Sequence, residues 1–187
     1  LCGGSLGVLA AYYGGLAETA IMRIIDILMA IPSIILSISI CAALGSGIVN
    51  TMIAVGISSI PTYARVFRSA VISEKSKEYI EASKAVGAGN ARIILRHILP
   101  NSLAPVIVQA SLGVAQAITT AASLSFIGLG IQPPNPEWGA LLSGGRQYIR
   151  DYPHMVVYPG IAIMLTVLAL NLIGDGLRDA LDPRLKR

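Results

Sequence analysis

Long apolar stretches that carry no charge alternate with shorter charged stretches along the chain. No Asp, Glu, Lys or Arg occurs at residues 1–17, 27–64, 97–136 or 152–174. A helix needs roughly 20 mostly apolar residues to cross the hydrocarbon core of a bilayer. A glycine-rich turn at residues 45–47 divides the second stretch. The pattern therefore predicts five hydrophobic helices, at residues 1–13, 20–44, 48–72, 101–126 and 154–174.

These segments predict an all-α integral membrane protein. Only helices and closed barrels satisfy the backbone in lipid, and the chain lacks the alternation of about ten residues that marks a barrel strand. Only 13% of the residues are charged, about half the share of a typical soluble domain. We expect residues 1–187 to form a single polytopic helix bundle. The first segment begins without an initiator Met or a basic leader, so we expect a fragment that lacks at least one N-terminal helix.

The basic residues predict how the chain is oriented in the membrane. With the five spans above, all but two of the 14 Lys and Arg residues fall on one side. The positive-inside rule makes that side cytoplasmic. It holds the loop at residues 74–100 and the tail at residues 175–187, whereas the loop at residues 130–153 is external. The net charge of +4 is then a signal of topology, and we expect no nucleic-acid partner.

No constellation in the sequence points to catalysis by this chain. His97 and His154 lie on separate segments, and Cys2 and Cys41 lie in apolar surroundings, so no cluster has metal-ligand spacing. The stretch LSGGRQ at residues 142–147 resembles a nucleotide-contacting signature of ATPases. It lies in the predicted external loop, however, and the chain has no GxxxxGK[ST] loop to hold phosphates. We expect no catalytic residue, metal site or cofactor.

Two other classes of membrane protein are alternatives to an ATP-driven permease. A channel or secondary transporter would need ionisable groups in the middle of its spans, and the long apolar runs contain none. A membrane-embedded enzyme would need convergent acid, base or nucleophile groups. Co-purification with an ATPase would separate an ATP-driven permease from both classes.

The loop at residues 74–100 contains the most specific pattern in the chain. Within the stretch SKEYIEASKAVGAGNARIILRHILPNS, a short surface helix is expected around Glu78 and Glu81. Glycines and an asparagine at residues 87–90 end that helix because they tolerate a left-handed turn. A second helix is expected at residues 91–98, before Pro100 kinks the chain into the next span.

This loop resembles the coupling loop of ABC importer permeases. The family pattern is EAA, three residues, Gly, nine residues and then IxLP. The chain has Glu81-Ala82-Ser83, then Gly87, then His97-Ile98-Leu99-Pro100, and it departs from the pattern at Ser83 and His97. The ending RHILPN, with three stretches at residues 22–34, 125–142 and 171–187, is similar to the dipeptide, oligopeptide and nickel branch. Within that branch the chain resembles the subunit that ends in a DPRL tail.

The resemblance implies a non-catalytic permease subunit in a bacterial or archaeal cell membrane. Its partners would be a second homologous permease subunit, two cytoplasmic ABC ATPase subunits that bind ATP and Mg, an extracytoplasmic substrate-binding protein, and membrane lipid. The resemblance places ATPase contacts at Glu78, Glu81, Ala82, Ser83, Gly87, Ala88, Arg92 and Pro100. Glu81 would make a charged contact and Gly87 would provide the turn. A merely solvated helix face is the alternative for Glu81, and peptides and nickel chelates both stay open as substrates.

Charged residues at two predicted span ends have simpler interpretations. Arg23 and Asp26 are three residues apart on one helix face, which predicts a local ion pair. Asp175, Asp179 and Asp182 have basic neighbours, which predicts a solvated helix end.

Overall fold

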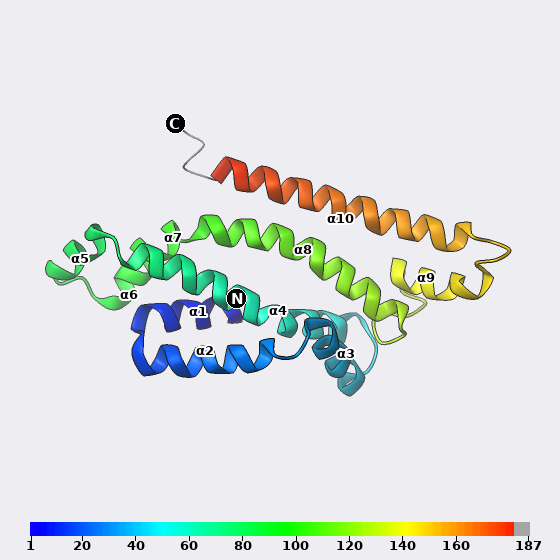
Figure 1. The fold of residues 1–187 in the computed structure, drawn as a ribbon, viewed down its shortest axis with the longest axis horizontal. Helices are drawn as coiled ribbons and strands as arrows, with labels where there is room; N and C mark the ends of the chain where they lie inside the picture. Colours follow the sequence, from blue (N-terminus) through cyan, green and yellow to red (C-terminus); the bar gives the residue numbers. More distant parts are fainter. Residues whose placement is uncertain (182–187) are drawn as a thin grey trace. The chain divides into compact units, whose positions relative to one another are not determined.

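The protein is described by a computed structural model that covers residues 1–181. All regular secondary structure in this range is helical, which confirms the predicted all-α class (Figure 1). The elements are α1 (Cys2–Tyr13), α2 (Gly15–Met29), α3 (Ser33–Leu44), α4 (Ile48–Lys75), α5 (Glu78–Ala85), α6 (Asn90–Ile93), η1 (Ile94–Ile98), α7 (Leu99–Asn101), α8 (Leu103–Phe126), α9 (Trp138–Gly145), η2 (Arg146–Tyr148) and α10 (His154–Leu181).

The helices form two compact units. The first contains Leu1–Ala30, Ser59–Ala110 and the described part of Gly176–Arg187, and the second contains Ile31–Ser58 and Ser111–Asp175. Both units draw on segments that are distant in the sequence. The loop at residues 74–100 belongs entirely to the first unit.

One predicted helix is wrong as a continuous element. Residues 20–44 form two helices, α2 and α3, because residues 30–32 break the helix. Pro32 caps the start of α3 in an extended conformation. Proline has no N–H to donate and disfavours helical geometry in the residue before it, so the backbone turns at this point.

The helices differ in their ability to cross a membrane. By length and apolarity α8 and α10 each suffice alone, and α2 with α3 suffices only as a bent pair. Helix α4 has 28 residues but carries polar side chains along its length, including Asn50, Thr51 and Thr62. The prediction of apolar spans is thus confirmed for at least two helices, and membrane crossing by α1 and α4 stays a prediction.

Glycines allow α1 to pack closely on α4 in the first unit. A Cβ atom added to Gly3 would lie 2.5 Å from the Ile60 carbonyl oxygen, and one added to Gly7 would lie 2.3 Å from the Ala64 carbonyl oxygen. Gly14 and Gly15 then have φ values of 68° and 57°, a region that glycine enters without steric cost. Their turn sends α2 back beside α1 (Figure 1).

The second unit has its own buried cluster and a short accessory helix. Cys41, Ala54 and Leu124 pack together. Residues 142–147 form the end of α9 followed by η2. Gly139 allows α9 to approach α8, because an added Cβ atom would lie 2.0 Å from the Ala122 carbonyl oxygen.

Candidate functional site

The loop at residues 74–100 folds largely as its sequence predicts. Helix α5 ends before a turn in which Gly87 has a φ of 83°, a left-handed conformation that suits glycine. The second predicted helix is present but irregular. It begins one residue early as α6 and continues as the π-helical turn η1 before α7.

Helix α5 has one buried contact and a broad exposed face. Ile80 is fully buried, whereas Glu78, Glu81 and Ala82 are exposed. The two glutamates lie in the first turn of the helix. Negative charge there interacts favourably with the helix dipole, so the two exposed carboxylates do not weaken α5.

An apolar cluster holds the loop against the first unit. It consists of buried residues from α1, α4 and the loop, with Ala88, Leu99 and other partly buried side chains packed against it. The buried members are Val8, Ala11, Tyr12, Val71, Ile80, Ile93 and Ile98. Burial of each large aliphatic side chain is favourable by about 1.5–3 kcal/mol, so this cluster is the main attachment of the loop.

Two polar contacts tie the loop region to the end of α1. The Tyr12 hydroxyl donates to Asn90 Oδ1 at 2.8 Å. Lys75 Nζ donates to the backbone oxygens of Tyr12 at 2.7 Å and Ala11 at 3.3 Å. The last carbonyls of a helix have no partner within the helix, so Lys75 caps α1 and fixes it beside the start of the loop.

A second polar group lies where the loop leaves α4. Glu74 is only 5% exposed. Its carboxylate accepts a hydrogen bond from the Tyr79 hydroxyl and forms an ion pair with Lys77 Nζ at 2.6 Å. Asn101 Nδ2 donates to the Tyr79 oxygen at 3.3 Å and to the His97 carbonyl at 2.7 Å. Burial, followed by the hydrogen bond to Glu74 and its charge, raises the pKa of Tyr79 to about 12. The Tyr79 hydroxyl therefore stays protonated as a donor at physiological pH.

The residues that the resemblance places at the ATPase contact do not form one surface on α5. Glu78, Glu81 and Ala82 share the exposed part of that helix, and the exposed Gly87, Arg92 and Pro100 lie beyond it on the turn and later elements. Ser83 and Ala88 are partly buried. The Ser83 hydroxyl donates to the Tyr79 carbonyl, and Ala88 packs on the apolar cluster. Contact of these eight residues with an ATPase stays a prediction.

Two apolar side chains of the loop were missed by the sequence reasoning. Val86 directly follows α5 and is 85% exposed, and Leu95 in η1 is 65% exposed. Large aliphatic residues exposed on a charged loop are candidates for a buried contact with a partner. The signal in the sequence was the valine next to the glycine-rich turn.

Ion pairs join α2 to α4 close to the loop. Asp26 pairs with Arg65 Nη2 at 2.7 Å, and Glu18 pairs with Arg68. The predicted pair of Arg23 with Asp26 is therefore wrong within the described residues. Spacing along one helix cannot reveal a partner on a neighbouring helix.

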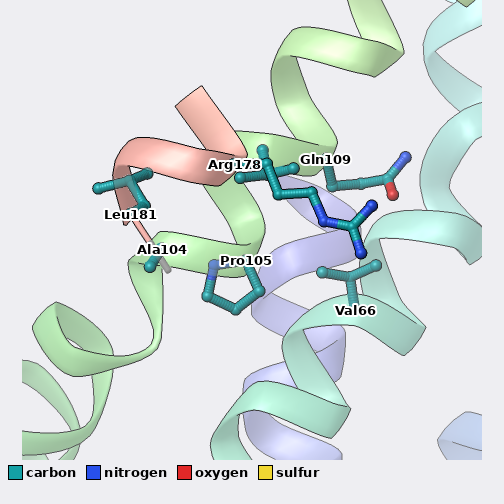
Figure 2. A pocket seen from close by; sticks show the side chains of 7 residues that line it. Val66, Ala104, Pro105, Gln109, Arg178 and Leu181 are labelled. Carbon is teal, nitrogen blue, oxygen red and sulfur yellow. The ribbon is translucent and has the colours of Figure 1, made fainter. Parts of the chain in front are cut away.

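The last helix ends beside a shallow hollow of about 400 Å³ in the first unit (Figure 2). The Arg178 side chain extends between Gln109 and Val66, and Pro105 lies on the wall (Figure 2). Asp175 and Asp179 are exposed, which confirms the predicted solvated helix end for these two residues. Asp182 and the rest of the predicted tail lie outside the described residues.

Potential metal ligands and free cysteines lie apart in the described part of the chain. Between residues 1 and 181, no group of three or more His, Cys, Asp or Glu side chains is placed to hold a metal ion. Cys41 is buried as expected of a small apolar residue, whereas Cys2 is exposed.

Comparison with known proteins places the chain in a family. Residues 3–187 match the family described as "Binding-protein-dependent transport system inner membrane component". The chain is 54% identical over 184 residues to the dipeptide transport system permease protein DppC of Alkalihalophilus pseudofirmus, covering 98% of this chain and 60% of the relative. It is 50% identical over 186 residues to the glutathione transport system permease protein GsiD of Pectobacterium atrosepticum, covering 100% of this chain and 62% of the relative.

A solved structure supports the fold. A chain of the MetNI methionine ABC transporter in an inward-facing conformation matches with a TM-score of 0.74 at 22% identity, over 96% of this chain and 86% of that one. The chain spans about three-fifths of the length of the curated relatives named above. The matched family description and these identities agree, and the chain belongs to the family of binding-protein-dependent transport system inner membrane components.

Proposed function

We propose that the chain is part of a permease subunit in an ATP-driven importer, and that residues 74–100 are its coupling loop. The single observation that carries this proposal is that α5 is exposed on one face and anchored on the other. Its carboxylate face is exposed while Ile80 and the ends of the loop are held by the body of the first unit. If a partner displaces such a helix, the displacement is transmitted to the membrane-spanning helices.

The proposed orientation puts the coupling loop in the cytoplasm. It is supported by the concentration of Lys and Arg at residues 65–96 and in the tail, compared with only Arg146 and Arg150 in the loop at residues 130–153. The proposed partners are two ABC ATPase subunits at the coupling loops, a second homologous permease subunit, and a substrate-binding protein on the other side. ATP and Mg are bound by the ATPases, so the chain itself needs no cofactor or catalytic residue.

The proposed cargo is a short peptide. This rests on the names of the two relatives with half or more of their residues in common, which are a dipeptide and a glutathione permease. Neither of these relatives is named as a nickel transporter, so peptides are the substrate class to test first. Movement of cargo would follow from ATP-dependent shifts between inward-open and outward-open states.

The test is co-purification of the full-length permease with its neighbouring transport proteins in mild detergent. Wild type is expected to bring down both an ATPase and a second permease. Glu81→Lys reverses the charge on the exposed face of α5 and is expected to release the ATPase while the second permease stays bound. Lys84→Glu, a charge reversal on the same helix outside the predicted contact set, is the control for a change of charge alone.

The assembled complex then reports the cargo. ATP hydrolysis should rise when substrate-binding protein loaded with a dipeptide is added, and it should rise less with nickel. Failure to recover any ATPase with the wild-type protein in several detergents contradicts the proposal and favours a transporter that works without ATP.

A further inference from the structure

A cluster of polar side chains closes the base of the coupling loop. Glu74 lies near the end of α4, Tyr79 is the second residue of α5, and Asn101 is the last residue of α7. The Tyr79 hydroxyl donates to Glu74 Oε1 and accepts from Asn101 Nδ2 at 3.3 Å. One hydroxyl group thus joins the helix that enters the loop, the exposed helix, and the segment that leaves the loop.

The carboxylate of this cluster is firmly held. Glu74 is buried and both of its oxygens have partners, Tyr79 at Oε1 and Lys77 at Oε2. A buried carboxylate that loses a partner is strongly disfavoured. The Glu74 carboxylate therefore favours the arrangement in which Tyr79 stays against α4.

Helix α5 needs such a contact to keep its orientation. It has eight residues, and isolated helices of that length are marginal in water. Its buried apolar contact is Ile80, and apolar contact is non-directional. The hydrogen bonds of the neighbouring Tyr79 are directional, so they fix the angle at which Glu78 and Glu81 are presented.

We propose that Glu74, Tyr79 and Asn101 form a latch that makes α5 move together with the ends of α4 and α7. With the latch closed, a displacement of α5 reaches the helices on both sides of the loop. With the latch open, Ile80 still attaches α5, but the helix pivots and the loop absorbs the displacement. These are positioning residues, and the inference rests on the proposed function of the coupling loop.

The hydroxyl can be removed without removing the ring. Tyr79→Phe is tested in the full-length complex of permease pair, ATPases and binding protein, reconstituted in liposomes. The ATPase is expected to stay bound, and hydrolysis without binding protein is expected to be unchanged. Amide exchange in residues 78–86 should rise about tenfold or more, the equilibrium equivalent of a lost hydrogen bond to a charged group. The ATP hydrolysed per dipeptide imported should rise several-fold.

Matched variants separate a latch from a general loss of stability. Tyr148→Phe removes a tyrosine hydroxyl from the second unit and is expected to leave both readouts unchanged. Glu74→Gln keeps an acceptor for Tyr79 and should remain closer to wild type than Glu74→Ala. Tyr79→Phe combined with Asn101→Ala should be less severe than the sum of the single changes, because contacting residues couple.

The outcomes distinguish the latch from the function beneath it. A wild-type complex that imports peptide, with Tyr79→Phe unchanged in exchange and in ATP per peptide, overturns the latch alone. Additive effects of Tyr79→Phe and Asn101→Ala also overturn it. Absence of an ATPase from the wild-type complex overturns the proposed function, and amide exchange in the full-length permease still tests whether Tyr79 restrains α5.

Discussion

Replacement of Gly7 by alanine should separate α1 from α4. The new Cβ atom would lie 2.3 Å from the Ala64 carbonyl oxygen, 2.9 Å from Phe67 Cβ and 3.0 Å from the Arg68 backbone nitrogen. Two of these atoms belong to the backbone of α4 and cannot rotate away, so α1 must move outward. Overpacking of this kind costs about 1–3 kcal/mol, and the better helix propensity of alanine returns roughly 0.5–1 kcal/mol.

The expected net destabilisation is about 0–2.5 kcal/mol, measured by thermal unfolding of the full-length protein in detergent. Gly160→Ala in α10 is the control, because an added Cβ atom there meets nothing within 4 Å. The control should be neutral or stabilising by up to about 1 kcal/mol. Because the Tyr12 hydroxyl at the end of α1 donates a hydrogen bond to Asn90, Gly7→Ala should also loosen the loop at residues 74–100. Equal melting temperatures for the two variants would refute the close packing of α1 on α4.

Two further predictions concern α9 and Tyr79. Gly139→Ala places a Cβ atom 2.0 Å from the Ala122 carbonyl oxygen, so α9 should move away from α8. Limited proteolysis should then cut residues 138–148 faster than in the control Gly144→Ala, where the added atom is in open space. Since the pKa of Tyr79 is raised from 10.0 to about 12, its contribution to folding stability is present below pH 10 and is lost as the pH rises toward 12. The ultraviolet difference between wild type and Tyr79→Phe should therefore show little tyrosinate absorption at pH 10.5. A full tyrosinate signal there would contradict the hydrogen bond that the Tyr79 hydroxyl donates to Glu74.

The sequence predicted those features that repeat locally. Charge-free apolar runs located α8 and α10, and the glycines near residue 87 located the end of α5. Each of these signals is made by residues that are close together in the sequence, so it can be recognised without knowledge of the fold. Pro32 can kink a helix, but the apolar run continues through it, so only the backbone shows that the helix breaks at residues 30–32.

The site could be predicted only where its residues form a motif. Glu81 and Gly87 belong to a pattern of fixed spacing, whereas Tyr79 belongs to no motif in the sequence. Its partners Glu74 and Asn101 are 5 and 22 residues away, and no helical or strand period connects them. The pair of Asp26 with Arg65 was hidden for the same reason, because these residues are 39 positions apart.

The central claim is that α5 contacts an ATPase, and site-specific cross-linking tests it most directly. A photoreactive amino acid is incorporated at position 81 of the full-length permease in the assembled complex, with position 148 in the predicted external loop as the control. The proposed function predicts an adduct with the ATPase from position 81 and none from position 148. An ATPase adduct from position 148, or repeated absence of one from position 81 in a complex that hydrolyses ATP, would contradict it.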